Sequence, residues 1–383
     1  MYSLRYILAA VLIAVAVTNA VDNGLGLTPQ MGWNSWNHFG CDINETIIMQ
    51  MAQAIATNGM AAAGYNYVNV DDCWAYSRDS NGVIQSDPTT FPSGMQYLAN
   101  YVHSLGLKFG LYTCAGTETC AGRPGSEGYE AIDAQTYASW GVDYLKEDWC
   151  NTGNNNPVDL YTTMSKALNA TGRPIFFSLC NWGVDNPWAW GPDVGNSWRT
   201  TGDINDSWDR FLQILYAQIP IASYSGVGGW NDPDMLEVGN GGMSNLEYTT
   251  HFSMWSLLAA PLIAGNDLRS VDAATLAIYT AKEVIAVNQD KLGTQGTLVK
   301  SLNQGDQQIW ARPLADGSRA VVLFNADDTN TFTIQLNWGD IWLSPNQAMT
   351  VRDLWAETDL GQFTGSFTSA TIPPHGSVML RVY

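Results

Sequence analysis

Short apolar runs alternate with amphipathic stretches along the first three quarters of the chain. Strands are predicted where the apolar runs are uninterrupted, at 30–33, 67–71, 108–113, 142–148, 175–180, 197–200, 221–225 and 262–264. Helices are predicted between them, at 45–58, 94–105, 131–140, 160–168, 207–218 and 249–258. Alternating strands and helices are typical of a parallel sheet, and eight repeats fit a (β/α)8 TIM barrel. A doubly wound sheet fits the periodicity nearly as well, but no G-x-G-x-x-G stretch opens a helix after the first strand.

The pattern changes after Asp290. Residues 307–383 alternate apolar and polar positions in short runs with turn formers between them, at 307–314, 319–326, 331–338, 348–355, 368–375 and 376–383. Such runs predict a small antiparallel β-sandwich. We therefore expect a catalytic barrel at 21–290, followed by a C-terminal sandwich domain at 291–383.

Residues 1–20 are typical of a secretory signal peptide. Arg5 precedes an apolar run at 6–17, and Thr18-Asn19-Ala20 is a small-residue cleavage site. The run is shorter than the ~20 residues that span a bilayer, so we expect no membrane insertion. The predicted destination is outside the cell, or the lumen of a lysosome or vesicle.

Charge and cysteine content narrow the range of partners. A net charge of −19 disfavours nucleic acid and anionic lipid. Six cysteines without a C-x-x-C pair, and only four histidines, argue against a zinc site. No metal or cofactor is expected. Glycosylation sequons occur at Asn44, Asn169 and Asn205.

Polar residues gather where the predicted barrel strands end, which is where a (β/α)8 barrel places its active site. Asp71-Asp72, Lys146 with Asp148, Cys180-Asn181-Trp182, Arg199 with Asp203, and Asp232 with Asp234 all occupy such positions. A lone Asp after a strand is usually a helix cap or a turn residue. Five such strand ends instead predict a pocket of carboxylates, cations and indole faces, which suits a sugar.

Two carboxylates are the minimum for glycoside hydrolysis. Composition and spacing alone do not select the pair from six candidates, namely Asp71, Asp72, Asp148, Asp203, Asp232 and Asp234.

Seven motifs stand in order along the chain: DNGLGLTPQMGWNSWNHF (22–39), GYNYVNVDDCW (64–74), YLKEDWCN (144–151), SWRTTGDINDSW (197–208), GGWNDPDML (228–236), SLLAAPLIAGNDLR (256–269) and AVNQDKLG (286–293). Together they resemble the glycoside hydrolase family of secreted and lysosomal α-galactosidases and α-N-acetylgalactosaminidases. The resemblance covers nearly the whole chain after residue 21. It implies a (β/α)8 barrel followed by a β-sandwich, in agreement with the periodicity.

The resemblance also implies roles for single residues. Asp148 falls on the family's nucleophile and Asp203 on its general acid/base, in a retaining double displacement without metal. The two carboxyl groups are then expected about 5–5.5 Å apart. The galactose contacts fall on Trp36, Asp71, Asp72, Tyr112, Lys146, Cys180, Arg199 and Asp234. The resemblance places Asn181 near the sugar's 2-substituent, and the bulk of the adjacent Trp182 favours a plain hydroxyl there over an N-acetyl group.

The family's disulfides fall on Cys41–Cys73 and Cys120–Cys150. Cys114 and Cys180 are then left over, at the ends of strands that are not neighbours. We expect two free thiols, with Cys180 lining the pocket.

Position 147 departs from the family, where an aromatic residue is usual. Side chains alternate along a strand, so Lys146 and Asp148 should share the inner face and Glu147 should face the helices. We expect Glu147 to have a partner there, such as a Lys, an Arg, a Tyr or a backbone N–H.

The leading hypothesis is an exo-acting α-galactosidase that removes terminal α-D-galactose from oligosaccharides, galactomannans or glycoconjugates. An α-N-acetylgalactosaminidase and a β-L-arabinopyranosidase are alternatives. A catalytically inactive sugar-binding protein is disfavoured because both Asp148 and Asp203 are present. A carbohydrate is the expected partner, and the choice between monomer and homodimer is open. Asn205 lies two residues after Asp203, so we expect it to carry no glycan.

Overall fold

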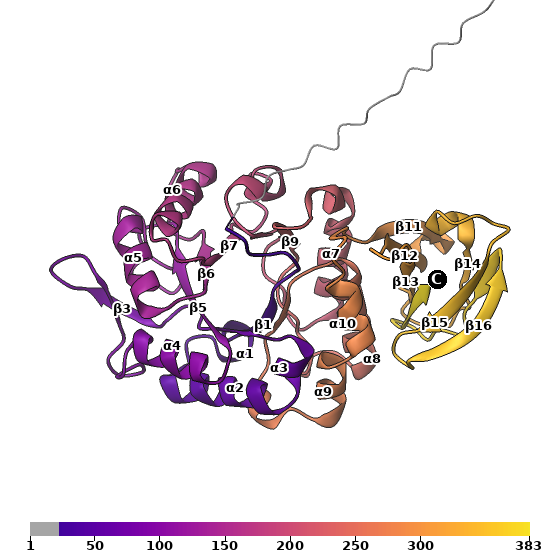
Figure 1. Ribbon diagram of the computed structural model, residues 1–383, viewed down its shortest axis with the longest axis horizontal. Coiled ribbons are helices and arrows are strands. Elements are labelled where there is room, and N and C mark those ends of the chain that lie inside the picture. The colour runs from indigo at the N-terminus through magenta and orange to yellow at the C-terminus, as the bar shows by residue number, and fades with distance from the viewer. Residues whose placement is uncertain (1–22) are drawn as a thin grey trace, which may run out of the picture.

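The computed structural model describes residues 23–383, and the predicted signal peptide lies outside them. Eight short strands form one parallel sheet in the order β10-β1-β2-β5-β6-β7-β8-β9 (Figure 1). A parallel bridge between Leu236, just after the last strand, and Ala264 joins the two ends of the sheet into a barrel. The strands are β1 (Met31–Asn34), β2 (Tyr67–Asn69), β5 (Lys108–Cys114), β6 (Tyr144–Asp148), β7 (Phe176–Cys180), β8 (Ser197–Arg199), β9 (Trp230–Asp232) and β10 (Leu262–Ala264).

Helices surround the sheet and begin at residues suited to helix ends. Asn44 caps the first long helix by accepting from the Ile47 N–H at 2.9 Å. Ser244 and Glu247 form a capping box at the start of α8. The helices are α1 (Trp36–Phe39), α2 (Glu45–Thr57), α3 (Met60–Ala63), α4 (Met95–Ser104), α5 (Glu130–Trp140), α6 (Pro157–Ala170), α7 (Trp208–Ala217), α8 (Asn245–Leu257), α9 (Ala273–Tyr279) and α10 (Lys282–Asn288).

The two faces of each barrel strand meet different surroundings, as strand alternation requires. On β6, Leu145 is fully buried in the large apolar core beneath the helices. Tyr144 points inward and stacks on Phe176 with ring centroids 5.1 Å apart. This aromatic cluster fills the barrel interior below the ends of the strands, so the polar residues at those ends lie above a packed floor.

The C-terminal part is antiparallel, as expected. One sheet runs in the order β11-β12-β13-β18-β15-β16, and a pair of short strands, β14 and β17, lies beside it (Figure 1). A separate apolar core fills this unit, with Ile309, Val321, Leu336 and Trp338 among its buried members. The strands are β11 (Thr297–Leu302), β12 (Gln307–Pro313), β13 (Arg319–Asn325), β14 (Gln335–Asn337), β15 (Ala348–Asp353), β16 (Thr358–Thr364), β17 (Ser366–Thr368) and β18 (Ser377–Val382).

Some predicted elements are wrong. Residues 221–225 belong to a 3₁₀-helix at Ile219–Tyr224, and the corresponding strand is β9 at Trp230–Asp232. The proline at position 220 lacks a backbone N–H and favours the start of a helix. The strand predicted at 368–375 is mostly irregular, because the prolines at 373 and 374 cannot donate to a ladder. A hairpin of β3 (Ala75–Arg78) and β4 (Ile84–Ser86) was not predicted. Among the described residues, no helix is long and apolar enough to cross a membrane.

Candidate active site

A cavity of about 710 Å³ opens at the carboxyl ends of the barrel strands. Its lining includes all the predicted catalytic and sugar-contacting residues except Cys180: Trp36, Asp71, Asp72, Tyr112, Lys146, Asp148, Trp182, Arg199, Asp203 and Asp234. Asp232, one of the six candidate carboxylates, does not line this cavity. The lining residues come from segments far apart in the sequence. The parallel sheet brings them together because it places all strand ends at the same rim.

Asp148 ends β6 and is held by two hydrogen bonds. Its Oδ2 accepts from the Tyr112 hydroxyl at 2.9 Å, and its Oδ1 accepts from the Trp149 backbone N–H at 2.9 Å. Burial raises the pKa of the Asp148 carboxyl, and the positive charge of Lys146 opposes that rise. The side chain is therefore fixed in direction at the floor of the cavity.

Asp71 and Asp72 follow β2 and are almost completely buried. Asp71 Oδ2 accepts from Lys146 Nζ at 2.8 Å and from Asn34 Nδ2 at 2.7 Å. Asp72 accepts from the backbone N–H groups of Cys73 at 2.6 Å and Ala121 at 2.9 Å. Burial raises the pKa of Asp72, and these backbone donors oppose the rise. The pair presents fixed hydrogen-bond acceptors next to the Lys146 ammonium.

Arg199, at the end of β8, lies between two carboxylates. Its Nη2 is 2.8 Å from Asp234 Oδ2 and 2.9 Å from Asp203 Oδ1. Asp203 is the most open of these groups, with 68% of its side chain exposed. Burial raises the pKa of Asp203, but the adjacent Arg199 outweighs it, and the pKa is lowered overall. Without a ligand, Asp203 is held ionised by this pair.

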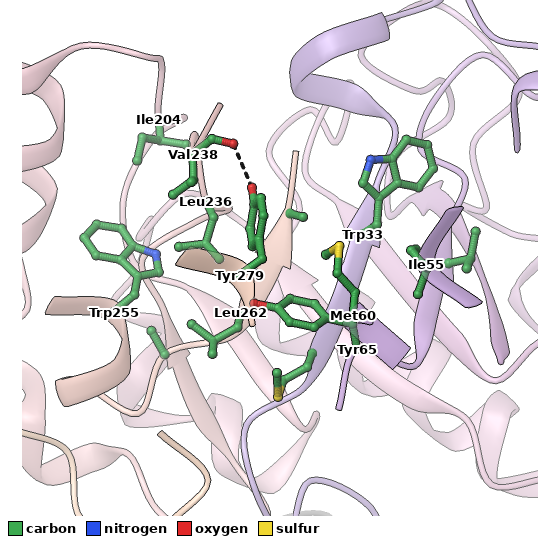
Figure 2. Packing of buried hydrophobic residues seen from close by; sticks show 14 of the residues in the cluster. Trp33, Ile55, Met60, Tyr65, Ile204, Leu236, Val238, Trp255, Leu262 and Tyr279 are labelled. Carbon is green, nitrogen blue, oxygen red and sulfur yellow. Dashed lines mark hydrogen bonds between the residues drawn. The ribbon is translucent and has the colours of Figure 1, made fainter. Parts of the chain in front are cut away.

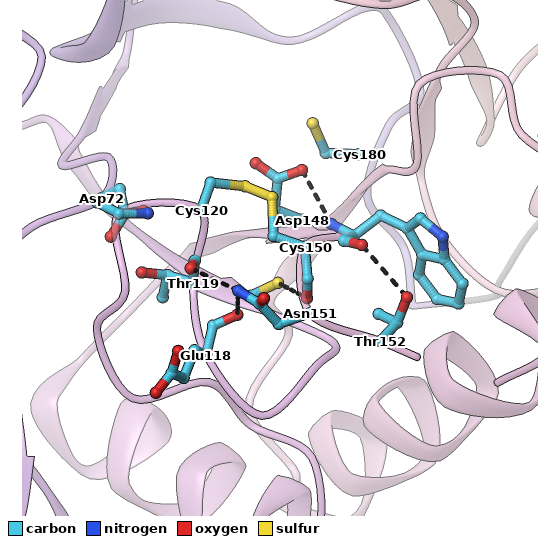
Figure 3. Close-up of a disulfide and its surroundings, with 12 residues drawn as sticks. Asp72, Glu118, Thr119, Cys120, Asp148, Cys150, Asn151, Thr152 and Cys180 are labelled. Atoms are coloured by element: carbon cyan, nitrogen blue, oxygen red, sulfur yellow. Dashed lines mark hydrogen bonds between the residues drawn. A yellow bond between two sulfur atoms is a disulfide. The ribbon is translucent and has the colours of Figure 1, made fainter. Parts of the chain in front are cut away.

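Cys180 does not line the cavity, contrary to the prediction. Its side chain is fully buried at the end of β7, beside the carboxyl of Asp148 (Figure 3). Arg199 Nη1 lies 3.6 Å from its sulfur. Cys180 lies level with Asp148 in the strand register, but its side chain is covered by neighbouring groups, while Trp182, two residues on, reaches the cavity wall.

Glu147 faces away from the cavity, as strand alternation predicts, but the predicted partner is absent. Only 1% of the residue is exposed, and among the described residues Oε2 has no hydrogen-bond partner. Tyr161 donates its hydroxyl to the Glu147 backbone carbonyl at 3.2 Å rather than to the carboxyl. Burial raises the pKa of Glu147 well above its usual value, and the nearby Glu130 and Asp133 add to the rise.

Two disulfides flank the site. Cys41 pairs with Cys73, and Cys120 pairs with Cys150, while Cys114 and Cys180 are free buried thiols. Figure 3 shows the second disulfide next to Asp148. Cys120 also lines the cavity, and the Tyr112 hydroxyl is 3.5 Å from its sulfur. This bridge joins the loop after β5 to the segment that follows the predicted nucleophile.

The donor atoms at the site do not fit a metal ion. Among the described residues, the one group of clustered potential ligands is Cys120, Asp148 and Cys150. Its two sulfurs are bonded to each other and are not thiolates.

Sequence reasoning missed several residues on the rim formed by the segment after β9. Glu237 and Asn240 line the cavity there, as do Asn37 of α1 and Asp206. Burial raises the pKa of Glu237 to about 7, with Asp234 and Asp206 adding to the rise. A signal for Glu237 was present, because a charged residue between Leu236 and Val238 must point away from the core that those two residues enter.

Comparisons with known proteins agree on one family. A model described as "Alpha galactosidase A" matches residues 28–290, and one described as "Alpha galactosidase C-terminal beta sandwich domain" matches residues 304–382. A "Probable alpha-galactosidase" of Dictyostelium discoideum is 64% identical, over 97% of this chain and 96% of that protein. An "Alpha-galactosidase" of Cyamopsis tetragonoloba is 51% identical, over 94% and 87%. The crystal structure of alpha-galactosidase I from Mortierella vinacea superimposes with a TM-score of 0.91 at 42% identity, over 94% and 98%.

Proposed function

The chain belongs to the α-galactosidase family of glycoside hydrolases, and from that premise we propose how its cavity hydrolyses a terminal non-reducing α-D-galactoside. The observation that carries the proposal is the placement of Asp148 and Asp203 in one cavity, one buried and held by Tyr112, the other exposed at the opening. This asymmetry is what two carboxyls with different roles require.

In the first step the Asp148 carboxylate attacks the anomeric carbon. A new bond forms between that carbon and a carboxyl oxygen, and the bond to the leaving oxygen breaks. Asp203 gives its proton to the leaving oxygen as it departs. The Tyr112 hydroxyl and the Trp149 N–H keep the attacking carboxylate aligned during this step.

In the second step Asp203, now ionised, removes a proton from water. The water oxygen bonds to the anomeric carbon from the face that the leaving group vacated, and Asp148 is released as carboxylate. Two displacements at one carbon retain its configuration. The pairing of Asp203 with Arg199 favours this basic state. For the first step, sugar hydroxyls that take up the Arg199 donors would weaken the pair and allow Asp203 to hold its proton.

The remaining cavity residues hold the sugar. Asp71 and Asp72 accept hydrogen bonds from hydroxyls that distinguish galactose from glucose, with the Lys146 ammonium beside them. Trp36 supplies an aromatic face for the apolar side of the ring. Trp182 narrows the wall near the 2-position and favours a plain hydroxyl there.

We further propose that the enzyme works in an oxidising compartment, secreted or in a lysosomal or vesicular lumen. The two disulfides support this location, because they persist outside reducing compartments. Oligosaccharides, galactomannans and glycoconjugates are all candidate substrates.

The test compares three aryl glycosides: an α-galactoside, an α-N-acetylgalactosaminide and a β-L-arabinopyranoside. We expect the α-galactoside to be turned over fastest, and Asp148→Asn to lower kcat by at least about 10³-fold because the attacking carboxylate is lost. Asp209→Asn, at an exposed position in the first turn of α7, is the control and should keep full activity. Faster turnover of either other glycoside would reject the substrate assignment, and an active Asp148→Asn would reject the nucleophile.

A further inference from the structure

Glu237 is a buried cavity carboxyl to which the proposed reaction gives no role. Only 3% of the residue is exposed, and each of its carboxyl oxygens accepts one amide N–H. Asn37 Nδ2 donates to Oε1 at 2.5 Å, and Asn240 Nδ2 donates to Oε2 at 2.6 Å. Asn240 lies on the same segment as Glu237, whereas Asn37 belongs to α1, which follows β1. The carboxylate therefore bridges two loops of the barrel.

The Glu237 side of this bridge is rigid. Leu236 and Val238 are fully buried and enter the apolar core (Figure 2). The Leu236 N–H donates to the Ile263 carbonyl at 2.8 Å, next to the parallel bridge that closes the barrel. The Tyr279 hydroxyl donates to the Val238 carbonyl at 2.9 Å. Backbone contacts on both sides of Glu237 thus fix where its carboxylate projects.

The α1 side is held at its two ends: the Trp36 N–H donates to Asn34 Oδ1 at 2.8 Å, and the Cys41–Cys73 disulfide follows the helix. This helix has four residues, none of them buried, and its N-cap Ser35 makes no side-chain capping bond. Isolated helices of this length have no intrinsic stability, so contacts from outside must hold them. α1 carries Trp36, the residue proposed to face the sugar ring, and Asn37 follows Trp36 directly in the chain.

We propose that Glu237 is a positioning residue for galactose binding, which anchors α1 through Asn37 and so sets the place of Trp36 at the cavity wall. The inference rests on the proposed function, because it takes Trp36 as a sugar contact. Glu237 itself touches no reacting atom. Its effect should appear in binding of the sugar rather than in the bond-breaking step.

The chemistry of the bridge requires a carboxylate. Two amide donors meet two acceptor oxygens, and both hydrogen bonds are charge-assisted when Glu237 is ionised. Glutamine has the same shape but offers one acceptor and one NH₂ group, so it satisfies only one of the two amides. Asn37→Ala removes the other end of the same bridge without changing the rigid segment.

The experiment measures kcat, KM and the inhibition constant of free galactose for Asn37→Ala, Glu237→Gln and the double variant. Each single variant should raise KM and the inhibition constant about tenfold, as expected for a lost charge-assisted hydrogen bond, with kcat within about twofold. The KM and the inhibition constant of the double variant should be no higher than those of the more affected single variant, because both changes break the same contact.

Glu283→Gln is the matched control. It removes one of the two hydrogen bonds that Glu283 accepts from Arg352, and the negative charge that strengthens the other, outside the cavity, and should leave both constants unchanged. An inactive wild-type protein would reject the proposed function itself. An active wild type whose Asn37→Ala variant melts at a lower temperature but keeps its KM and inhibition constant would overturn the positioning role. Multiplied effects in the double variant would overturn it as well.

Discussion

Three consecutive charged residues at the end of β6 meet three different environments. Lys146 Nζ lies 2.8 Å from Asp71 Oδ2. Burial lowers the pKa of Lys146, but the negative charges of Asp71 and Asp148 outweigh burial and raise that pKa well above its usual value. The Asp148 carboxyl accepts two hydrogen bonds, whereas Oε2 of Glu147 accepts none from the described residues. Strand alternation explains this difference, since one face of β6 meets the polar cavity and the other meets packed helices.

Glu147 should make the protein less stable as the pH rises. Its pKa is raised in the folded state, so the native protein retains a proton that the unfolded chain releases above about pH 4.5. The unfolded state then binds fewer protons, and the free energy of unfolding falls with pH. Glu147→Gln cannot ionise. It should match the wild type at pH 4 and be more stable by about 1–3 kcal/mol at pH 8 in urea unfolding.

Glu118→Gln, at an exposed position, provides the comparison for this measurement. Its stability difference from the wild type should not change with pH. If the difference between Glu147→Gln and the wild type were also constant from pH 4 to pH 8, Glu147 would not titrate as its burial indicates.

Lys146 should control the ionisation of Asp148. Removing its positive charge in Lys146→Met disfavours the carboxylate, so the already raised pKa of Asp148 should rise further. The clean measurement uses an Asp203→Asn background and an aryl galactoside whose phenolate leaves without a proton, so that Asp203 no longer contributes and Asp148 is the remaining catalytic carboxyl. In that background the acid limb of kcat/KM should move to higher pH, and its plateau should fall at least about tenfold because Asp71 loses its partner.

Lys300→Met is the control for charge removal, because Lys300 pairs with Asp340 at 2.9 Å in the C-terminal sheet, away from the cavity. The acid limb of kcat/KM in Lys300→Met should lie at the same pH as in the background enzyme. An unchanged limb in Lys146→Met would show that Asp148 does not depend on this ammonium.

At the scale of elements, the sequence predicts long regular segments better than short ones. The 13-residue α2 differs from its prediction only at its last residue, and the three-residue strand at Leu262–Ala264 also matches because all three of its residues are apolar. By contrast, β9 has three residues, two of them polar, so it lacks the apolar run that identifies a strand. The apolar residues at 221–225 satisfy that pattern but follow a proline and form a 3₁₀-helix. Local pattern and tertiary pairing disagree where strands are this short.

Local sequence pattern also predicts only part of the site. Residues directly at strand ends, such as Asp71, Asp148 and Arg199, could be predicted from the architecture, because the barrel places all strand ends at one rim. Tyr112 lies within β5, and only the family resemblance singled it out. Glu237 lies in the segment beyond β9, where its place between the buried residues Leu236 and Val238 is the one signal of its direction. Whether a strand-end side chain such as Cys180 lines the cavity or is covered depends on the side chains packed around it, because its register partner Asp148 does line the cavity.

At the scale of the whole molecule, the apolar core around the barrel extends onto one face of the C-terminal sheet, while the separate core of the sandwich lies on the other face. The cluster that fills the space around the barrel continues into the sandwich through Trp310, Phe324 and Met379. The ring centroid of Trp208 in α7 lies 5.9 Å from that of Phe324. The Trp208 ring also stacks on the His375 ring, with centroids 4.2 Å apart. A continuous interface of this kind couples the unfolding of the two units.

The interface should make the two units unfold together. Trp355 of the C-terminal unit packs against Phe252 of α8 and donates its indole N–H to Ser253 Oγ at 2.9 Å. We expect calorimetry of the full chain to show one transition. Trp355→Ala should lower the free energy of unfolding by about 2–4 kcal/mol through the lost packing. Trp342→Ala, where 54% of the residue is exposed, should change it by less than about 0.5 kcal/mol. Two separate transitions, with the barrel melting unchanged in Trp355→Ala, would show that the sandwich is an independent unit.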